Sequence, residues 1–161
     1  TSRQQDFTGP KIVAPQRSPR NTFGYNEIEW YAASDVFFIT QKVENINLKF
    51  VLALLNSKLY YFWLYYRGKR KGENLELIVK PLSEIPIKVI SETKQKPFIE
   101  MVDQILSLAY SENYSQDPAK QKQLNILESR IDQMVYKLYD LTPDEINAVE
   151  EFRKDLYLQI Y

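Results

Sequence analysis

Neither histidine nor cysteine occurs among the 161 residues of the chain. Without histidine there is no imidazole general base, and without cysteine there is no thiolate nucleophile, no disulfide and no cysteine-based zinc site. Hydrolytic or metal chemistry would therefore have to use carboxylates, lysine, serine or tyrosine. The lack of cysteine also fits a reducing compartment, and we expect a cytoplasmic protein.

A hydrophobic run long enough to cross a membrane is also lacking. The most apolar stretch, residues 50–66, is shorter than the roughly 20 residues that a membrane-spanning helix needs, and Asn56, Ser57 and Lys58 interrupt it. The first ten residues, TSRQQDFTGP, contain neither an initiator methionine nor the apolar core of a signal peptide. We therefore expect a soluble piece of a longer protein that has no membrane partner.

Common catalytic motifs are absent as well. The sequence has no GxGxxG, GxxxxGK[ST], HExxH or GxSxG string, and it lacks the Asn/Asp-Pro-Pro-aromatic string of adenine methyltransferases. Glu92-Thr93-Lys94 has the E-x-K form of metal-dependent nucleases, in which carboxylates hold Mg²⁺. The aspartate that such a site needs has no clear candidate, so a polar linker is the preferred interpretation of this segment. We expect no catalytic residue and no metal or cofactor site in the chain.

The first half of the chain carries strand patterns around one helical pattern. The β-branched runs KIVAP (11–15) and SDVFFIT (34–40) flank a turn-forming RSPRN segment, and both predict strands. Apolar residues spaced three and four apart from Leu48 to Tyr66 predict a helix that is apolar nearly all round and therefore buried. LELIVKPL (75–82) predicts a strand stopped by Pro81, and IPIKVI (85–90) predicts an edge segment.

The second half is helical. An apolar stripe begins after Pro97, Asp117 before Pro118 marks a second helix start, and Thr142 with Glu145 forms a capping box that starts a third. We expect two antiparallel helices of about 15 to 20 residues and a shorter third. The fold class is therefore α+β (mixed α/β), with a small twisted sheet and a central apolar helix in residues 1–90 and a helical segment in residues 91–161, packed as one unit.

The net charge of zero conceals an unequal distribution of charges. Residues 1–88 contain 13 basic and 8 acidic side chains, a balance of +5, whereas residues 89–161 contain 8 and 13, a balance of −5. Basic residues near aromatic ones are typical of a nucleic-acid surface. We therefore take the following residues as candidates for DNA contact: Arg17, Arg20, Asn21, Lys58, Arg67, Lys69, Arg70, Lys71 and Asn74.

The order of several strings resembles the TaqI-like target-recognition domain found at the C-terminal side of type IIG restriction-modification enzymes and related N6-adenine DNA methyltransferases. The strings are KIVAPQRSPRNTFGY, SDVFFITQ, LKFVLALLNSKLYYFWLYYRGKRKGENLEL, PLSEIPIK and IDQMVYKLYDLTPDEI. The similarity runs from about Lys11 to Glu151. Its most specific parts are LLNSKL (54–59), IPI (85–87) and the closing IDQMVYKLYDLTPDE.

This resemblance implies a mixed α/β recognition domain, a double-stranded DNA partner and reading of the major groove. It also implies that the parent enzyme takes methyl groups from S-adenosylmethionine and, in type IIG members, cleaves DNA with a separate Mg²⁺-dependent endonuclease domain of the same chain. We expect Lys69 and Lys71 to contact phosphates, Arg17, Arg20 and Arg70 to contact guanine, and asparagines to contact adenine.

Two other functions remain open from the sequence. The first is a protein-interaction or scaffold domain that docks through its acidic helices, with the KRK segment as an idle solvated hairpin tip. The second is an enzyme that uses Glu92 and Lys94. Binding of duplex DNA would distinguish the recognition function from the first, and Mg²⁺-dependent nicking would support the second.

Overall fold

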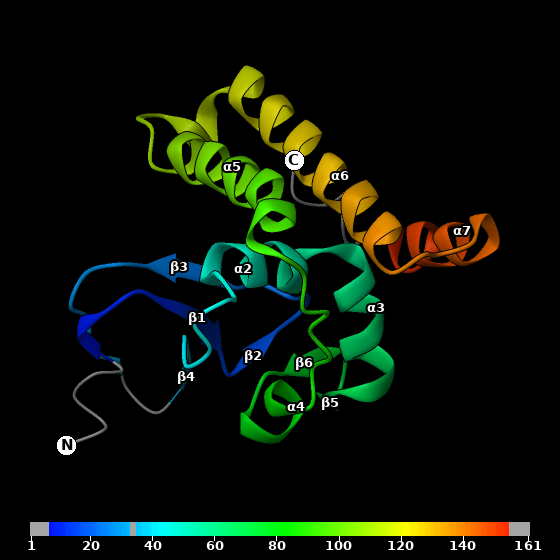
Figure 1. Ribbon diagram of the computed structural model, residues 1–161, viewed down its shortest axis with the longest axis horizontal. Coiled ribbons are helices and arrows are strands. Elements are labelled where there is room, and N and C mark those ends of the chain that lie inside the picture. Colours follow the sequence, from blue (N-terminus) through cyan, green and yellow to red (C-terminus); the bar gives the residue numbers. More distant parts are fainter. Residues whose placement is uncertain (1–6, 33–34, 155–161) are drawn as a thin grey trace.

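The computed structural model describes residues 7–32 and 35–154 (Figure 1). Strand β1 (Lys11–Pro15) lies at the centre of one antiparallel sheet, between β3 (Gly24–Asn26) and β4 (Val36–Thr40). Ile12 and Ala14 on β1 are fully buried, so one face of this sheet packs against the core. The strands expected at 11–15 and within 34–40 are both present.

A second antiparallel sheet has the order β2 (Arg17–Ser18), β6 (Asn74–Glu76), β5 (Lys69–Lys71). The chain passes directly from β1 into β2 and so from one sheet to the other. At the crossing, the Gln16 N–H donates to the Asp35 carbonyl (2.8 Å), and the Gln16 carbonyl accepts from the Leu77 N–H (2.8 Å). These two bonds connect Gln16 to the strand ends of both sheets.

The central apolar segment forms two helices where the periodicity predicts one. Helix α2 (Leu48–Asn56) ends at Ser57, whose extended backbone breaks the hydrogen-bond ladder, and α3 (Lys58–Arg67) begins at the next residue. Serine is a favoured N-cap, and the Ser57 side chain accepts from the Tyr60 N–H. Phe50 and Leu54 are fully buried, which confirms that this segment is central to the core.

Residues 75–82 and 85–90 differ from their predicted structure. The strand β6 stops at Glu76, and α4 (Val79–Ser83) follows with Pro81 inside its first turn. Proline is tolerated there because the first N–H groups of a helix have no intrahelical acceptor. Residues 85–90 have no regular secondary structure and pair with no strand. Instead, the Tyr60 hydroxyl donates to the Pro86 carbonyl (2.5 Å).

The C-terminal half contains α5 (Glu92–Ala109), the 3₁₀ turn η1 (Tyr114–Gln116), α6 (Pro118–Leu138) and α7 (Pro143–Glu151). The caps predicted at Asp117 and Thr142 are present, the second as a complete capping box with Glu145. Helices α5 and α6 lie side by side above α2 and α3 (Figure 1). None of the helices in the described ranges is both long and apolar enough to cross a bilayer.

Helix α5 starts five residues before Pro97, where the helical pattern was expected to begin. The buried amide of Gln95 explains the early start, because it accepts from the Asn47 N–H (2.9 Å) and donates to the carbonyls of Asn45 (2.7 Å) and Ile90 (3.0 Å). Glu92 and Lys94 therefore lie in the exposed first turn of a helix and not in a linker.

Candidate nucleic-acid interface

The basic segment after α3 is one strand of a β-hairpin. Lys69–Lys71 pairs antiparallel with Asn74–Glu76 through a two-residue turn, in which Gly72 has a φ of +62°. A left-handed glycine at the first turn position is typical of type II′ hairpins. Gly68 joins α3 to the hairpin so tightly that an added Cβ would lie 2.4 Å from the Leu64 carbonyl oxygen. Residues 69–71 therefore form a paired strand, and the tip of the hairpin is Gly72 and Glu73.

Strand alternation divides the second sheet into an inner and an outer face. Ser18 pairs with Leu75 and Leu75 with Arg70, and burial of Ser18 and Leu75 identifies their face as the inner one. The other pairs are Arg17 with Glu76, Glu76 with Lys69 and Lys71 with Asn74. We define the outer face by these residues: Arg17, Lys69, Lys71, Asn74 and Glu76.

The outer face carries three cations and one carboxylate. The Glu76 side chain is 10% exposed, and its carboxylate lies 3.0 Å from Lys69 Nζ and 3.6 Å from Arg17 Nε. The hydrogen bond from Lys69 and the nearby charges of Lys69, Arg17 and Lys71 hold the Glu76 pKa below its ordinary value. Arg17 and Lys69 remain 48% and 60% exposed. The surface is therefore ordered, accessible and net positive.

Arg70 and Arg67 lie beside this face. The Arg70 guanidinium carbon is 4.0 Å from the centroid of the Tyr65 ring, a cation–π contact on the inner side of the hairpin. Arg153 bonds both Tyr65 and Glu73, so this edge of the hairpin is joined to the end of the helical half. Arg67 is exposed in the last turn of α3. Both arginines flank the outer face without belonging to it.

Asn21 lies in the interior, away from the position expected of a base-reading residue. It is 4% exposed, and its Nδ2 group donates to the carbonyls of Leu55 (2.6 Å) and Ser57 (2.8 Å). Asn56 adds two hydrogen bonds between the same segments: it accepts from the Phe23 N–H and donates to the Phe23 carbonyl, both at 2.9 Å. The Asn21 amide is therefore used in hydrogen bonds within the protein, at the junction of α2 and α3.

Lys58 also points toward the helical half. Its Nζ lies 2.5 Å from Glu150 Oε2 and 3.9 Å from Asp132 Oδ2, and its backbone N–H donates to Asp132 (2.9 Å). Burial raises the Asp132 pKa to about 7, although the Lys58 contacts oppose that shift. The charge of Lys58 is therefore matched within the molecule, which differs from the expected role in DNA contact.

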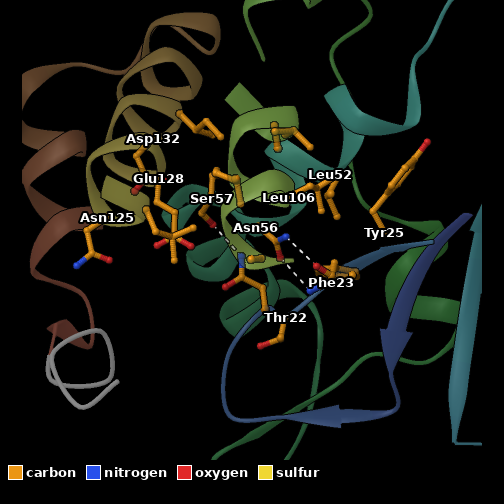
Figure 2. Close-up of a pocket in the computed structure, with 18 of the residues that line it drawn as sticks. Thr22, Phe23, Tyr25, Leu52, Asn56, Ser57, Leu106, Asn125, Glu128 and Asp132 are labelled. Atoms are coloured by element: carbon orange, nitrogen blue, oxygen red, sulfur yellow. Dashed lines mark hydrogen bonds between the residues drawn. The ribbon is translucent and has the colours of Figure 1, made fainter. Parts of the chain in front are cut away.

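Arg20 borders a cleft of about 410 Å³ between residues 20–25, the α2–α3 junction, α5 and α6. Figure 2 shows Asn125, Glu128 and Asp132 of α6 on one side and Phe23 and Leu52 on the other. Burial raises the Glu128 pKa, and the charges of Arg20 and Lys58 oppose this. No local sequence pattern indicates this cleft, because its walls come from five separate segments, η1 included.

The described residues contain no group of three or more carboxylates, histidines or cysteines that could hold a metal ion. Glu92 and Lys94 lie apart from the outer face, at the start of α5. The structure thus brings together Arg17, Lys69, Lys71 and Asn74, with Arg67 and Arg70 beside them. Arg20, Asn21 and Lys58 lie around the cleft instead.

Comparison with known proteins identifies related sequences for the first part of the chain. The family model described as TaqI-like C-terminal specificity domain matches residues 2–87. Two methyltransferases of Haemophilus influenzae, the type II methyltransferases M.HincII and M.HindII, are each 37% identical over 87 residues. These alignments cover 50% of this chain and 17% of each methyltransferase.

Proposed function

The chain belongs to the TaqI-like C-terminal specificity domain family, and on this premise we propose that it recognises double-stranded DNA within a restriction-modification enzyme. The similarity to type II methyltransferases supports this function, since a specificity domain supplies the target recognition that such an enzyme requires. The chain spans about a sixth of the length of those methyltransferases. Any catalytic activity of the whole protein is therefore proposed as well.

The proposed DNA-binding surface is the outer face of the second sheet. The end of the β5–β6 hairpin, at the Lys71–Asn74 pair, extends beyond β2 as a two-stranded ribbon, which is an element that the major groove admits. Lys69 and Lys71 would contact phosphates and release counterions, while Arg17 would contact guanine and Asn74 adenine. Arg67 and Arg70, beside the ribbon, would contact the flanking backbone. Arg20, Asn21 and Lys58 have no DNA contact in this proposal.

The remaining parts of the protein have proposed roles as well. Residues 1–90 would form the recognition part, and residues 91–161 would hold it against the methyltransferase part. The Phe50 and Phe98 rings, 5.2 Å apart, support packing of the two as one unit. The sites for S-adenosylmethionine and, if the enzyme also cleaves DNA, for Mg²⁺ would lie elsewhere in the same protein, in the cytoplasm.

The alternative is a protein-docking domain whose acidic helices contact a partner. The −5 balance of residues 89–161 favours that role for the helical half, because a surface of this charge would be repelled by DNA. The two functions are compatible if the helices dock within the enzyme while the outer face binds DNA. A chain that only docks proteins would show no duplex binding at low salt.

Fluorescence anisotropy with duplex DNA tests the proposal. The variant K69A/K71A should bind more weakly, and its slope of log K against log salt should be smaller in magnitude by up to about 1.8, or 0.9 for each lost phosphate contact. K94A/K96A removes the same charge from exposed positions of α5 and serves as the matched control. Equal slopes for the two double variants would refute the role of the outer face.

A further inference from the structure

Glu76 is the only carboxylate on the outer face, among the residues that the structure describes, and it lies on the middle strand between two cations. The cross-strand register places Arg17 on one side of it and Lys69 on the other. Directly opposed side chains on neighbouring strands are about 4.5–5.5 Å apart at Cβ, so the three form one continuous row. The Glu76 carboxylate lies 3.6 Å from Arg17 and 3.0 Å from Lys69, so it bridges the row.

A carboxylate in this position weakens the attraction of the face for phosphate. It is ionised at neutral pH because both neighbours stabilise the charged form and lower its pKa. The row therefore presents one net positive charge where two cations alone would present two. Since sequence-independent binding to DNA depends on the cations that release counterions, Glu76 reduces that kind of binding.

The same carboxylate restricts the two flexible side chains. Arginine and lysine lose much rotamer freedom when they bind, and a side chain that is already held loses less. The contact to Arg17 is made through Nε, which leaves the two terminal nitrogens of the guanidinium outside that contact. Those terminal nitrogens are suited to a paired contact with the O6 and N7 acceptors of guanine.

We propose that Glu76 is a positioning residue that makes the outer face discriminate between sequences. It holds Arg17 for base contact and limits the phosphate attraction of Arg17 and Lys69. Its removal leaves a more cationic and less ordered face, which binds more DNA sequences with less discrimination. This inference rests on the proposed DNA-binding function and assigns a task to a residue that is itself too buried to be a main DNA contact.

Glu76→Gln is the first test, because glutamine keeps the size of the side chain and removes its charge. Binding to a pool of duplexes of random sequence should strengthen, and the salt slope should grow by about 0.9, equivalent to one further phosphate contact. Glu84→Gln makes the same charge change at an exposed position on the end of α4. Its slope should change by less than half as much. Equal slopes for both variants would overturn the proposal.

Glu76→Asp separates position from charge. Aspartate keeps the negative charge but retracts it by one methylene, so it should leave the salt slope near that of the unaltered protein. Repeated selection from the random pool should nevertheless yield a less defined sequence than the unaltered protein selects. A consensus as sharp as that of the unaltered protein in both Glu76 variants would contradict the positioning role.

Failure of the proposed function and failure of the inference about Glu76 give different results. If the unaltered chain binds no duplex at about 50 mM salt, the proposed function fails and the inference falls with it. If the unaltered chain binds and selects a sequence but Glu76→Gln has an unchanged slope, only the inference fails. Urea denaturation of every variant establishes that the folded protein is compared, and Glu76→Asp keeps the proposal testable if Glu76→Gln does not fold.

Discussion

Replacement of Asn21 by alanine distinguishes a structural asparagine from one that reads DNA. The substitution removes the two hydrogen bonds from Nδ2 to the carbonyls of Leu55 and Ser57. The Ser57 carbonyl keeps the Tyr61 N–H (3.1 Å) as a partner. The Leu55 carbonyl, at the end of α2, loses this donor, and Leu55 is 1% exposed.

The two lost hydrogen bonds have different costs in the free energy of unfolding. A buried carbonyl left without a donor costs roughly 1–3 kcal/mol, and a hydrogen bond lost from a group that keeps another partner costs about 0.5–1.5 kcal/mol. The expected destabilisation is therefore about 2–4 kcal/mol. This is a large part of the ~5–15 kcal/mol that stabilises an ordinary domain.

Urea denaturation followed by aromatic fluorescence measures the change. With a slope of about 2 kcal/mol per molar urea, the Asn21→Ala midpoint should fall by about 1–2 M while the slope itself is unchanged. Asn74→Ala is the matched control, since Asn74 is exposed at the start of β6. It should lower stability by less than about 0.5 kcal/mol.

In DNA binding the order should be reversed, so that Asn74→Ala and not Asn21→Ala has the larger effect. Folded Asn21→Ala should bind duplex DNA like the unaltered protein, whereas Asn74→Ala should bind its target more weakly. Full stability together with loss of DNA binding in Asn21→Ala would refute the structural role of Asn21.

Three further substitutions test the local structure. Gly68→Ala should destabilise the protein by about 1–3 kcal/mol in thermal unfolding, because its Cβ would meet the Leu64 backbone at 2.4 Å; a neutral result would show that the α3–β5 junction is loose. Thr142→Ala should cost about 1 kcal/mol through loss of the capping box, measured by urea denaturation. Asp132 has a pKa raised to about 7 in the folded protein, above its ordinary value of about 4, so it stays protonated in the folded state over a range where it ionises in the unfolded state. Stability is therefore lost as the pH rises from about 4 to 7, and Asp132→Asn should be more stable than the unaltered protein at pH 8 by up to about 4 kcal/mol, with the difference vanishing near pH 4. An equal difference at both pH values would contradict this assignment.

Features set by neighbouring residues could be predicted from the sequence. The caps at Asp117 and Thr142 were correct because an N-cap depends on side chains within one turn of the helix. The strands predicted at 11–15 and within 34–40 are present because β-branched and aromatic residues favour strands locally. The family resemblance was correct for residues 2–87, because it rests on strings of residues and needs no geometry.

Features set by distant residues could not be predicted. Lys69–Lys71 has little intrinsic strand preference and is a strand because β6 pairs with it. The interior position of Asn21 depends on its hydrogen bonds to the α2–α3 junction, and the direction of the Lys58 side chain depends on its ion pair with Glu150. The place of Glu76 between two cations depends on the pairing of β2 with β6, which no local pattern indicates.

The most direct test of the DNA-binding surface is to map it on the whole chain by backbone amide NMR during titration with duplex DNA. Binding through the outer face should shift the amides of β2, β5 and β6 first and leave those of α6 and α7 nearly unchanged. Shifts concentrated on α6 and α7, with the amides of Lys69–Lys71 unaffected, would contradict the proposed interface.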